Sequence, residues 1–247
     1  MKLLITNDDG FEADGLQELA KRLSRDHEVY VVAPDSGRSC CGHSVTNADS
    51  LHVVRHSDTG WSVSGTPADC IRMATLVLKI QPDWILSGVN HGGNLGIDTI
   101  YSGTVAAARE ATVLGFPSIA LSQYMRREIP KDWKQSAQFA SKVLDHLWNL
   151  PLQPGYFWNV NLPAIAPIEG FFEGQSHHSF PMVECPLEKA PLSISYEPDR
   201  VHPEHDLRST HLYQSNYQQR PRQDGSDVHY CFSGHATITK LGIFGIE

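Results

Sequence analysis

The chain has little of what marks a secreted or membrane-bound protein. Only five of its 247 residues are cysteine, and no two of them stand in a Cys-x-x-Cys pair. Cys40 and Cys41 are adjacent, a poor geometry for a disulfide between them. This usage of cysteine favours a reducing compartment. No apolar run reaches the roughly 18 residues of a membrane span, and the first residues predict a strand instead of a signal sequence. We therefore expect a cytoplasmic protein with no membrane partner.

Positive charge is also scarce. The chain has 20 Lys and Arg against 28 Asp and Glu, a formal net charge of −8, and no basic run. This argues against a DNA- or RNA-binding surface, so any recognition of phosphate must come from local groups. A length of 247 residues with 40% hydrophobic content is enough for one large domain, or for one domain with an appended arm.

Strand and helix patterns alternate over residues 1–163. Leu3, Leu4 and Ile5 form a continuous apolar run, which is typical of a strand buried on both faces of a parallel sheet. Further strands are expected at residues 28–33, 51–55, 61–64, 84–87, 118–122 and 158–162. Helices are expected around residues 16–23, from Pro67 with Thr66 as N-cap, over 104–114 and over 133–150. The alternation predicts an α/β fold with a Rossmann-like, doubly wound, mostly parallel sheet.

The sequence pattern changes after residue 163. Prolines, histidines and short strand-like pieces, such as 192–196 and 236–241, replace the βαβ pattern. We predict three parts: a Rossmann-like catalytic core at residues 1–163, a β-rich or irregular arm at 164–225 that could serve oligomerisation, and a segment at 226–247 that returns to the core.

Oxygen-bearing side chains follow three successive predicted core strands. Asp8 and Asp9 follow the first strand, Ser39 lies in the Gly- and Ser-rich loop after the second, and Asn90 follows the third. The carboxyl ends of parallel strands share one edge of the sheet, where ligands bind in open α/β folds. Two adjacent carboxylates repel each other unless a positive charge lies between them or one is protonated. Carboxylate, hydroxyl and amide oxygens suit Mg²⁺, Mn²⁺ or Ca²⁺, and the four residues form our candidate ligand set.

A second candidate site precedes the helix at 104–114. Ser102, Gly103 and Thr104 lead directly into this helix, whose free N–H groups and dipole favour an anion. The hydroxyls could instead merely cap the helix. Five glycines at or just before this turn would let the backbone approach a ligand closely; they are residues 88, 92, 93, 96 and 103. A cation beside an oxyanion site is the minimal equipment for hydrolysing a phosphate ester.

Seven short motifs stand in order along residues 1–163. They are Thr6-Asn-Asp-Asp-Gly10, Ala33-Pro-Asp35, Arg38-Ser39, Gly65-Thr-Pro-Ala-Asp-Cys70, Ser87-Gly-Val-Asn90, Tyr101-Ser-Gly-Thr-Val105 and Asn159-Val-Asn161. Together they closely resemble the SurE family of metal-dependent nucleoside monophosphate phosphatases. The resemblance implies hydrolysis of nucleoside 5′-monophosphates by metal-activated water, and it leaves 3′-monophosphates open as further substrates.

The resemblance also implies roles for individual residues. The family's metal ligands match Asp8, Asp9, Ser39 and Asn90, and the two aspartates would be catalytic. Its phosphate-site segments match Asn94 and residues 102–104, namely Ser102, Gly103 and Thr104. One Mg²⁺ or Mn²⁺ per subunit and assembly into a homodimer or homotetramer are further expectations.

Beyond residue 163 the resemblance becomes weaker. Ser226-Asp227 and residues 234–239 look like the family's closing motif, but Lys240 stands where a proline is expected. The family's usual Asp-Pro-Arg-Gly pattern is not found between residues 164 and 225. In relatives this region supports oligomer formation and borders the active site, so substrate preference and oligomeric state depend on the part of the chain where the resemblance is weakest.

Several residues near these motifs have open roles. His43 and His91 lie in the functional loops, where either could touch substrate or donate a proton to the leaving group, or simply bond to backbone. Arg38 could contact a phosphate or pair with Asp35. For Tyr101 we expect packing in the core over contact with a nucleobase.

Two other functions share some of these features. A receiver-like or nucleotide-binding regulatory module without hydrolytic activity also places two acids after its first strand. A receiver would need a phosphoacceptor aspartate after the third core strand, where this chain has Ser87-Gly-Val-Asn90. A phosphatase in which Asp8 itself attacks phosphorus usually spaces its acids Asp-x-Asp, so the adjacent pair fits metal ligation better.

Overall fold

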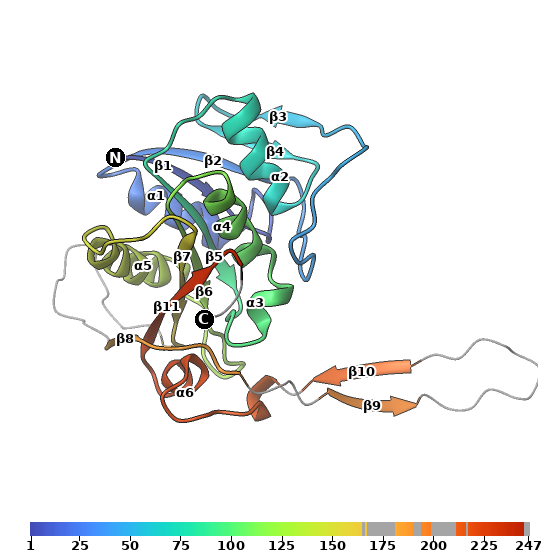
Figure 1. Cartoon of the computed structure of the whole chain (residues 1–247), viewed down its shortest axis with the longest axis vertical. Coiled ribbons are helices and arrows are strands. Elements are labelled where there is room, and N and C mark those ends of the chain that lie inside the picture. Colours follow the sequence, from blue (N-terminus) through green and yellow to red (C-terminus); the bar gives the residue numbers. More distant parts are fainter. Residues whose placement is uncertain (165, 167–180, 190–193, 199–210, 216, 245–247) are drawn as a thin grey trace, which may run out of the picture.

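In the computed structural model, a nine-stranded, mostly parallel sheet carries helices on both faces (Figure 1). The structure describes residues 1–164, 166, 181–189, 194–198, 211–215 and 217–244. The order of the strands is β3-β4-β2-β1-β5-β6-β7-β11-β8. The predicted α/β, Rossmann-like fold is confirmed.

Six strands run parallel to one another: β1 (Lys2–Thr6), β2 (Glu28–Pro34), β4 (Gly60–Val63), β5 (Trp84–His91), β6 (Ser118–Gln123) and β7 (Tyr156–Leu162). β3 (Val53–Arg55) pairs antiparallel with β4. β11 (Ala236–Gly242) lies antiparallel to β7, and β8 (Met182–Glu184) pairs parallel with β11. Because β8 belongs to the main sheet, the segment predicted as an arm contributes one strand to the core.

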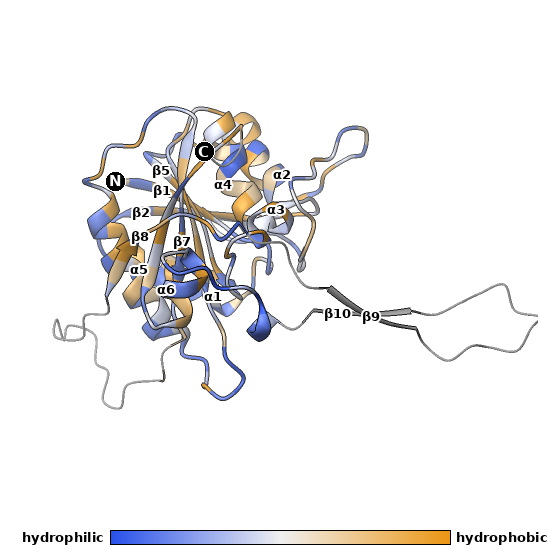
Figure 2. Ribbon diagram, turned by 60° about the horizontal axis from the view of Figure 1, so that its bottom comes forward, coloured by the Kyte–Doolittle hydropathy of each residue, from blue (hydrophilic) through white to orange (hydrophobic). Residues whose placement is uncertain are grey.

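Two helical layers cover the sheet (Figure 2). One face carries α1 (Asp14–Leu23) and α5 (Trp133–Leu147), and the other carries α2 (Pro67–Arg72) and α4 (Gly103–Val113). The remaining helices are the π-helix η1 (Met73–Val77), α3 (Asp98–Tyr101), the 3₁₀-helix η2 (Tyr217–Gln219) and α6 (Asp227–Phe232). No helix within the described ranges has both the length and the apolar character needed to cross a membrane.

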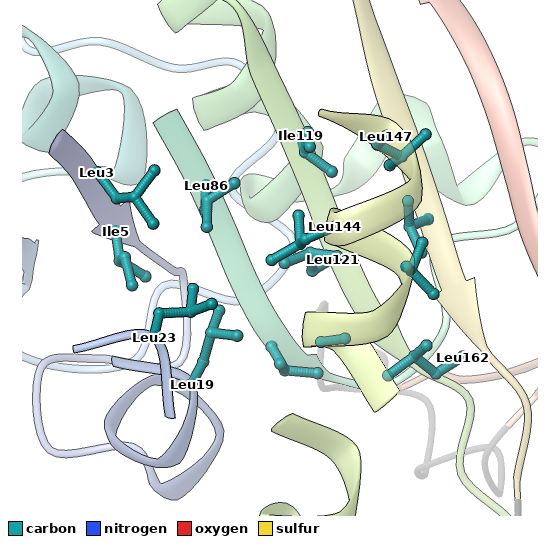
Figure 3. Close-up of a cluster of buried hydrophobic side chains, with 14 of the residues drawn as sticks. Leu3, Ile5, Leu19, Leu23, Leu86, Ile119, Leu121, Leu144, Leu147 and Leu162 are labelled. Atoms are coloured by element: carbon teal, nitrogen blue, oxygen red, sulfur yellow. The ribbon is translucent and has the colours of Figure 1, made fainter. Parts of the chain in front are cut away.

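The apolar run of β1 is buried on both faces of the sheet, as expected. Leu3 and Ile5 belong to the cluster beneath α1 and α5, whereas Leu4 belongs to the cluster beneath α2 and α4. All three are fully buried. Figure 3 shows Leu3 and Ile5 in the first cluster, which extends to Leu162 at the end of β7. Successive side chains of a strand point to opposite faces, so a strand covered on both sides must be apolar throughout.

The structure confirms the start of one predicted helix and changes the bounds of other predicted elements. The predicted N-cap Thr66 forms a capping box with Asp69, and Gly115, which follows α4, has φ of +88°. The strand predicted to end at Ser87 continues as β5 to His91, with a register shift against β6 between Ser87 and Asn90. The short helices α3 and α6 were not predicted. The piece predicted at residues 192–196 is described only from Ile194, in β9 (Ile194–Pro198), which pairs antiparallel with β10 (His211–Ser215).

Candidate active site

The candidate site lies at the carboxyl edge of three neighbouring strands. The chain passes from β1 to β2 on one side and later returns to β5 on the other side of β1. Such a reversal of strand order leaves a crevice at the carboxyl ends, where ligands of open α/β folds bind. A cavity of about 380 Å³ occupies this position. Six of the eight predicted site residues line it: Asp8, Asp9, Ser39, Asn90, Asn94 and Ser102.

The turn after β1 fixes the two aspartates. The side chain of Asn7 accepts from the Gly10 amide at 3.2 Å and donates to the Gly10 carbonyl at 3.0 Å. Gly10 has φ of +108°, a conformation that a residue with a Cβ rarely adopts. This closed turn directs Asp8 and Asp9 into the cavity from consecutive positions.

Asp8 is the buried member of the pair, with 5% of its surface exposed. Burial, opposed by the hydrogen bond from Thr104 and reinforced by the nearby charge of Asp9, raises its pKa to about 6. Asp9 is partly exposed, and one of its oxygens accepts from the backbone N–H of His91 at 2.9 Å. The two carboxylates therefore line the same cavity, close enough for the charge of Asp9 to raise the pKa of Asp8.

Backbone contacts bring Ser39 to this pair. The N–H of Arg38 donates to the Asp8 carbonyl at 2.7 Å, and the N–H of Gly42 donates to the Tyr101 carbonyl at 3.0 Å. The intervening loop is thus fastened on both sides of the cavity. The side chain of Ser39 is exposed and lines the cavity wall.

Asn90 approaches from β5. Its side-chain nitrogen donates to the Gly92 carbonyl at 2.7 Å, so its amide oxygen is the atom left to serve as a cation ligand. Asn94 is held farther along the same loop, because its side chain donates to Ser122 Oγ at 2.8 Å and its backbone N–H donates to Asn161 at 2.7 Å. Both asparagines line the cavity.

Of the three residues predicted to bind an anion at the start of α4, one lines the cavity and two do not. Ser102 caps the helix by accepting from the Val105 N–H at 3.1 Å, and it also lines the cavity. Thr104 is fully buried, and its hydroxyl donates to Asp8 at 2.5 Å. A Cβ on Gly103 would come within 2.8 Å of the Asp8 Cβ. Gly103 and Thr104 therefore lie behind Asp8, outside the set of residues that line the cavity.

The residues whose roles the sequence left open lie in different surroundings. His91 lines the cavity, whereas the ring of His43 points to the buried Glu110, whose other carboxylate oxygen accepts from Arg72 at 2.6 Å. Arg38 pairs with Asp35 at 3.3 Å. The expectation of core packing for Tyr101 is wrong. The residue lies in the cavity wall at the end of α3 and is 54% exposed.

Sequence reasoning missed two residues, one in the cavity wall and one paired with it. Asp98, in α3, lines the cavity. Arg220, far along the chain, forms a bidentate pair with it. Asp98 could have been noticed because it falls between the two singled-out motifs, but nothing in the sequence links it to a residue 122 positions away.

The donor set fits a hard divalent cation. Two carboxylates, one amide oxygen and one hydroxyl line the same cavity, and the carboxylates repel each other without a positive charge between them. Among the residues that the structure describes, no group of three or more His, Cys, Asp and Glu side chains could hold a metal ion. That observation fits a set that takes half of its ligands from serine and asparagine.

Comparison with known proteins identifies the family of the chain. The model of the family described as survival protein SurE matches residues 3–176. A 5′-nucleotidase SurE from Thermosynechococcus vestitus is 44% identical over 177 residues, which cover 68% of this chain and 66% of the relative. A protein of Nostoc sp., whose description assigns 5′-nucleotidase activity provisionally, is 40% identical over 98% of this chain and 100% of its own length. The crystal structure of SurE from Aquifex aeolicus superimposes with a TM-score of 0.82 at 28% identity, covering 98% of this chain and 94% of that one.

These matches define an α/β protein with a Rossmann-like sheet, of a class whose relatives are named 5′-nucleotidases. The chain belongs to the SurE family.

Proposed function

We propose that this protein is a 5′-nucleotidase that hydrolyses nucleoside monophosphates to a nucleoside and inorganic phosphate. The observation that carries the proposal is the shared cavity of Asp8, Asp9, Ser39 and Asn90 beside the capped start of α4. Family membership supports the same activity, because relatives such as the Thermosynechococcus protein are named 5′-nucleotidases. We include 3′-monophosphates as possible substrates.

In this proposal Asp8, Asp9, Ser39 and Asn90 hold one divalent cation per subunit, Mg²⁺ or Mn²⁺. A cation bound there would polarise a phosphoryl oxygen, lower the pKa of a water and offset the charge that develops during phosphoryl transfer. Asp8 and Asp9 supply the negative charge that retains it. The hydrogen bond from Thr104 fixes the orientation of the Asp8 carboxylate, and the N–H of His91 does the same for Asp9.

Asn94 and Ser102 line the wall on which we place the phosphate. Asn94 is held by Ser122 and Asn161, so its position does not depend on bound substrate. Gly103 allows the start of α4 to pack against Asp8, and the N-terminal end of a helix favours an anion. Tyr101, half exposed in the same wall, is available to contact the nucleoside.

A phosphate-release assay tests the function. We expect release from nucleoside 5′-monophosphates with Mn²⁺ or Mg²⁺, and loss of release with EDTA that is restored by adding back the cation. Wild-type release that EDTA leaves untouched, or no release from any nucleotide with either ion, would contradict the proposal. A purely regulatory module would give the second result.

We also propose that the chain assembles into a homodimer or homotetramer. β9 and β10 form a two-stranded sheet separate from the main one, and Figure 1 shows it extending away from the body. An isolated two-stranded hairpin has marginal stability in water, so such a pair favours a packing partner. Light scattering coupled to gel filtration distinguishes a dimer or tetramer from a monomer, and a monomer would contradict this part. Cytoplasmic localisation stays a prediction.

A further inference from the structure

Arg220 is a buried cation directly behind the wall of the cavity. Only 6% of its surface is exposed. Its two terminal nitrogens donate to the two carboxylate oxygens of Asp98 at 2.5 and 3.1 Å, and one of them also donates to the Leu95 carbonyl at 3.2 Å. The guanidinium carbon lies 4.7 Å from the ring centroid of Tyr217. The Arg220 end of this ion pair is therefore shielded from water.

The charges that line the cavity are all of one sign. Asp8, Asp9 and Asp98 contribute carboxylates, and no lysine or arginine is among the described residues of the lining. The expected substrate carries a phosphate dianion. The first two carboxylates belong to the proposed cation site, but Asp98 lies outside it and would repel the phosphate unless its charge were neutralised in place.

We propose that Arg220 sets the affinity of the site for phosphate by neutralising Asp98. The inference rests on the proposed function, since it assigns a role in binding the phosphate group of the substrate. Arg220 is absent from the cavity lining, so its charge would act on the phosphate through Asp98. It also lies outside residues 3–176, the segment that the SurE family model matches.

Other contacts already hold the loop between Asn90 and Ser102. Tyr217 donates to the Gly93 carbonyl at 3.1 Å, and the carboxylate of Asp227 accepts from the Gly96 N–H at 2.8 Å. Asp98 itself accepts from the Leu95 N–H at 3.2 Å. None of these three hydrogen bonds comes from Arg220, although its guanidinium packs on the Tyr217 ring and donates to the Leu95 carbonyl. We therefore expect the loop to stay fastened when the charge of Arg220 is removed.

The test compares charge variants of the pair. In Arg220→Met we expect the KM for a nucleoside 5′-monophosphate to rise about tenfold while kcat changes less than about threefold, because repulsion weakens ground state and transition state alike. Asp98→Asn should lower KM by about threefold. The double variant Asp98→Asn/Arg220→Met should return KM to within about threefold of wild type, and Arg220→Lys, which keeps the charge, should raise KM less than Arg220→Met does. The matched control is Arg55→Met, which removes an arginine paired with Asp58 on the surface hairpin.

Calorimetric titration with inorganic phosphate supplies a readout besides turnover and should rank the variants in the same order. If Arg220→Met does not fold, Asp98→Asn and Arg220→Lys still test whether Arg220 acts by neutralising Asp98. A higher KM or weaker phosphate binding in Asp98→Asn overturns the inference, as does a double variant no better than Arg220→Met. A wild-type protein that releases no phosphate from nucleotides refutes the proposed function, whereas normal turnover with an unchanged KM in Arg220→Met refutes only this inference.

Discussion

The hydroxyl of Thr104 donates to the buried carboxylate of Asp8 at 2.5 Å, which joins the first turn of α4 to the end of β1. The two residues are 96 positions apart in the chain. Because the bond favours the ionised carboxylate, it opposes the rise in the pKa of Asp8 that burial causes. The contact therefore maintains the charge and the orientation of the aspartate that we assign to the cation.

Thr104→Val should weaken binding of Mn²⁺ and lower turnover, each by about tenfold to a hundredfold, because it removes a partner of a proposed ligand while keeping the volume of the side chain. Calorimetric titration with Mn²⁺ measures the first effect. Thr112→Val is the matched control: Thr112 is a buried threonine of the same helix that bonds to the Ala108 carbonyl and to Ser118. Both variants should lose some stability, but equal loss of Mn²⁺ affinity in the two would remove the role assigned to Thr104.

Asp9→Asn should lower phosphate release by at least about a hundredfold, because it removes one of the two charges that hold the cation. The asparagine oxygen can still accept from His91, so folding should persist, as checked by circular dichroism. Asp35→Asn removes an exposed carboxylate outside the cavity lining and should leave release within about twofold. Undiminished turnover in Asp9→Ala would count against the entire cation site.

Gly103→Ala should impair catalysis more than stability. An added Cβ would meet the Cβ of Asp8 at 2.8 Å and the sulfur of Cys41 at 2.9 Å, so the start of α4 or the aspartate must shift. We expect a loss of kcat/KM of at least about tenfold, since a small displacement at a reacting centre is costly. Gly37→Ala serves as the control because its nearest neighbour is at 3.6 Å. Comparable kinetics for the two variants would show that close packing at Gly103 is unimportant.

Stability of the metal-free protein should depend on pH through Asp227. Burial, opposed by hydrogen bonds from the N–H groups of Gly96, Glu188 and Val228, raises the pKa of this carboxyl to about 6. The native state therefore binds the proton more tightly than the unfolded chain, whose pKa is near 3.8. The stabilisation is complete below the unfolded pKa and is lost as pH rises through 6, amounting to about 1 kcal/mol between pH 5 and 7.

Urea unfolding at pH 5 and pH 7 measures this effect when wild type is compared with Asp227→Asn. The variant should be less stable at both pH values, because an amide nitrogen cannot accept from the Gly96 N–H. Its stability should nevertheless fall less from pH 5 to pH 7 than that of wild type. Parallel pH profiles for the two proteins would show that Asp227 is not the responsible group.

Local patterns were enough to predict the central part of the fold. The apolar run at Leu3–Ile5 indicated a strand covered on both faces, and Thr66-Pro67 indicated the start of a helix; both are confirmed. These patterns succeed because burial and capping act on residues that are near in sequence. By contrast, α3 and α6 have four and six residues, too few to show a helical repeat.

The candidate site was predictable where its residues lie at the carboxyl ends of strands or in the loops that follow them. Asp8, Ser39 and Asn90 share one cavity because strand order brings their loops together. Long-range pairing was not predictable in the same way. The bonds of Thr104 to Asp8 and of Arg220 to Asp98 depend on how α4, α3 and the segment after η2 pack against the sheet, which no local pattern specifies.

The position of β11 has a consequence for synthesis of the chain on the ribosome. β7 ends at residue 162, yet its second neighbour in the sheet is completed only at residue 242. A nascent chain that already contains every proposed cation ligand therefore still exposes one edge of β7, and such unpaired edges are sites of aggregation. Chaperone dependence should thus be greatest for translation products that stop between these two strands.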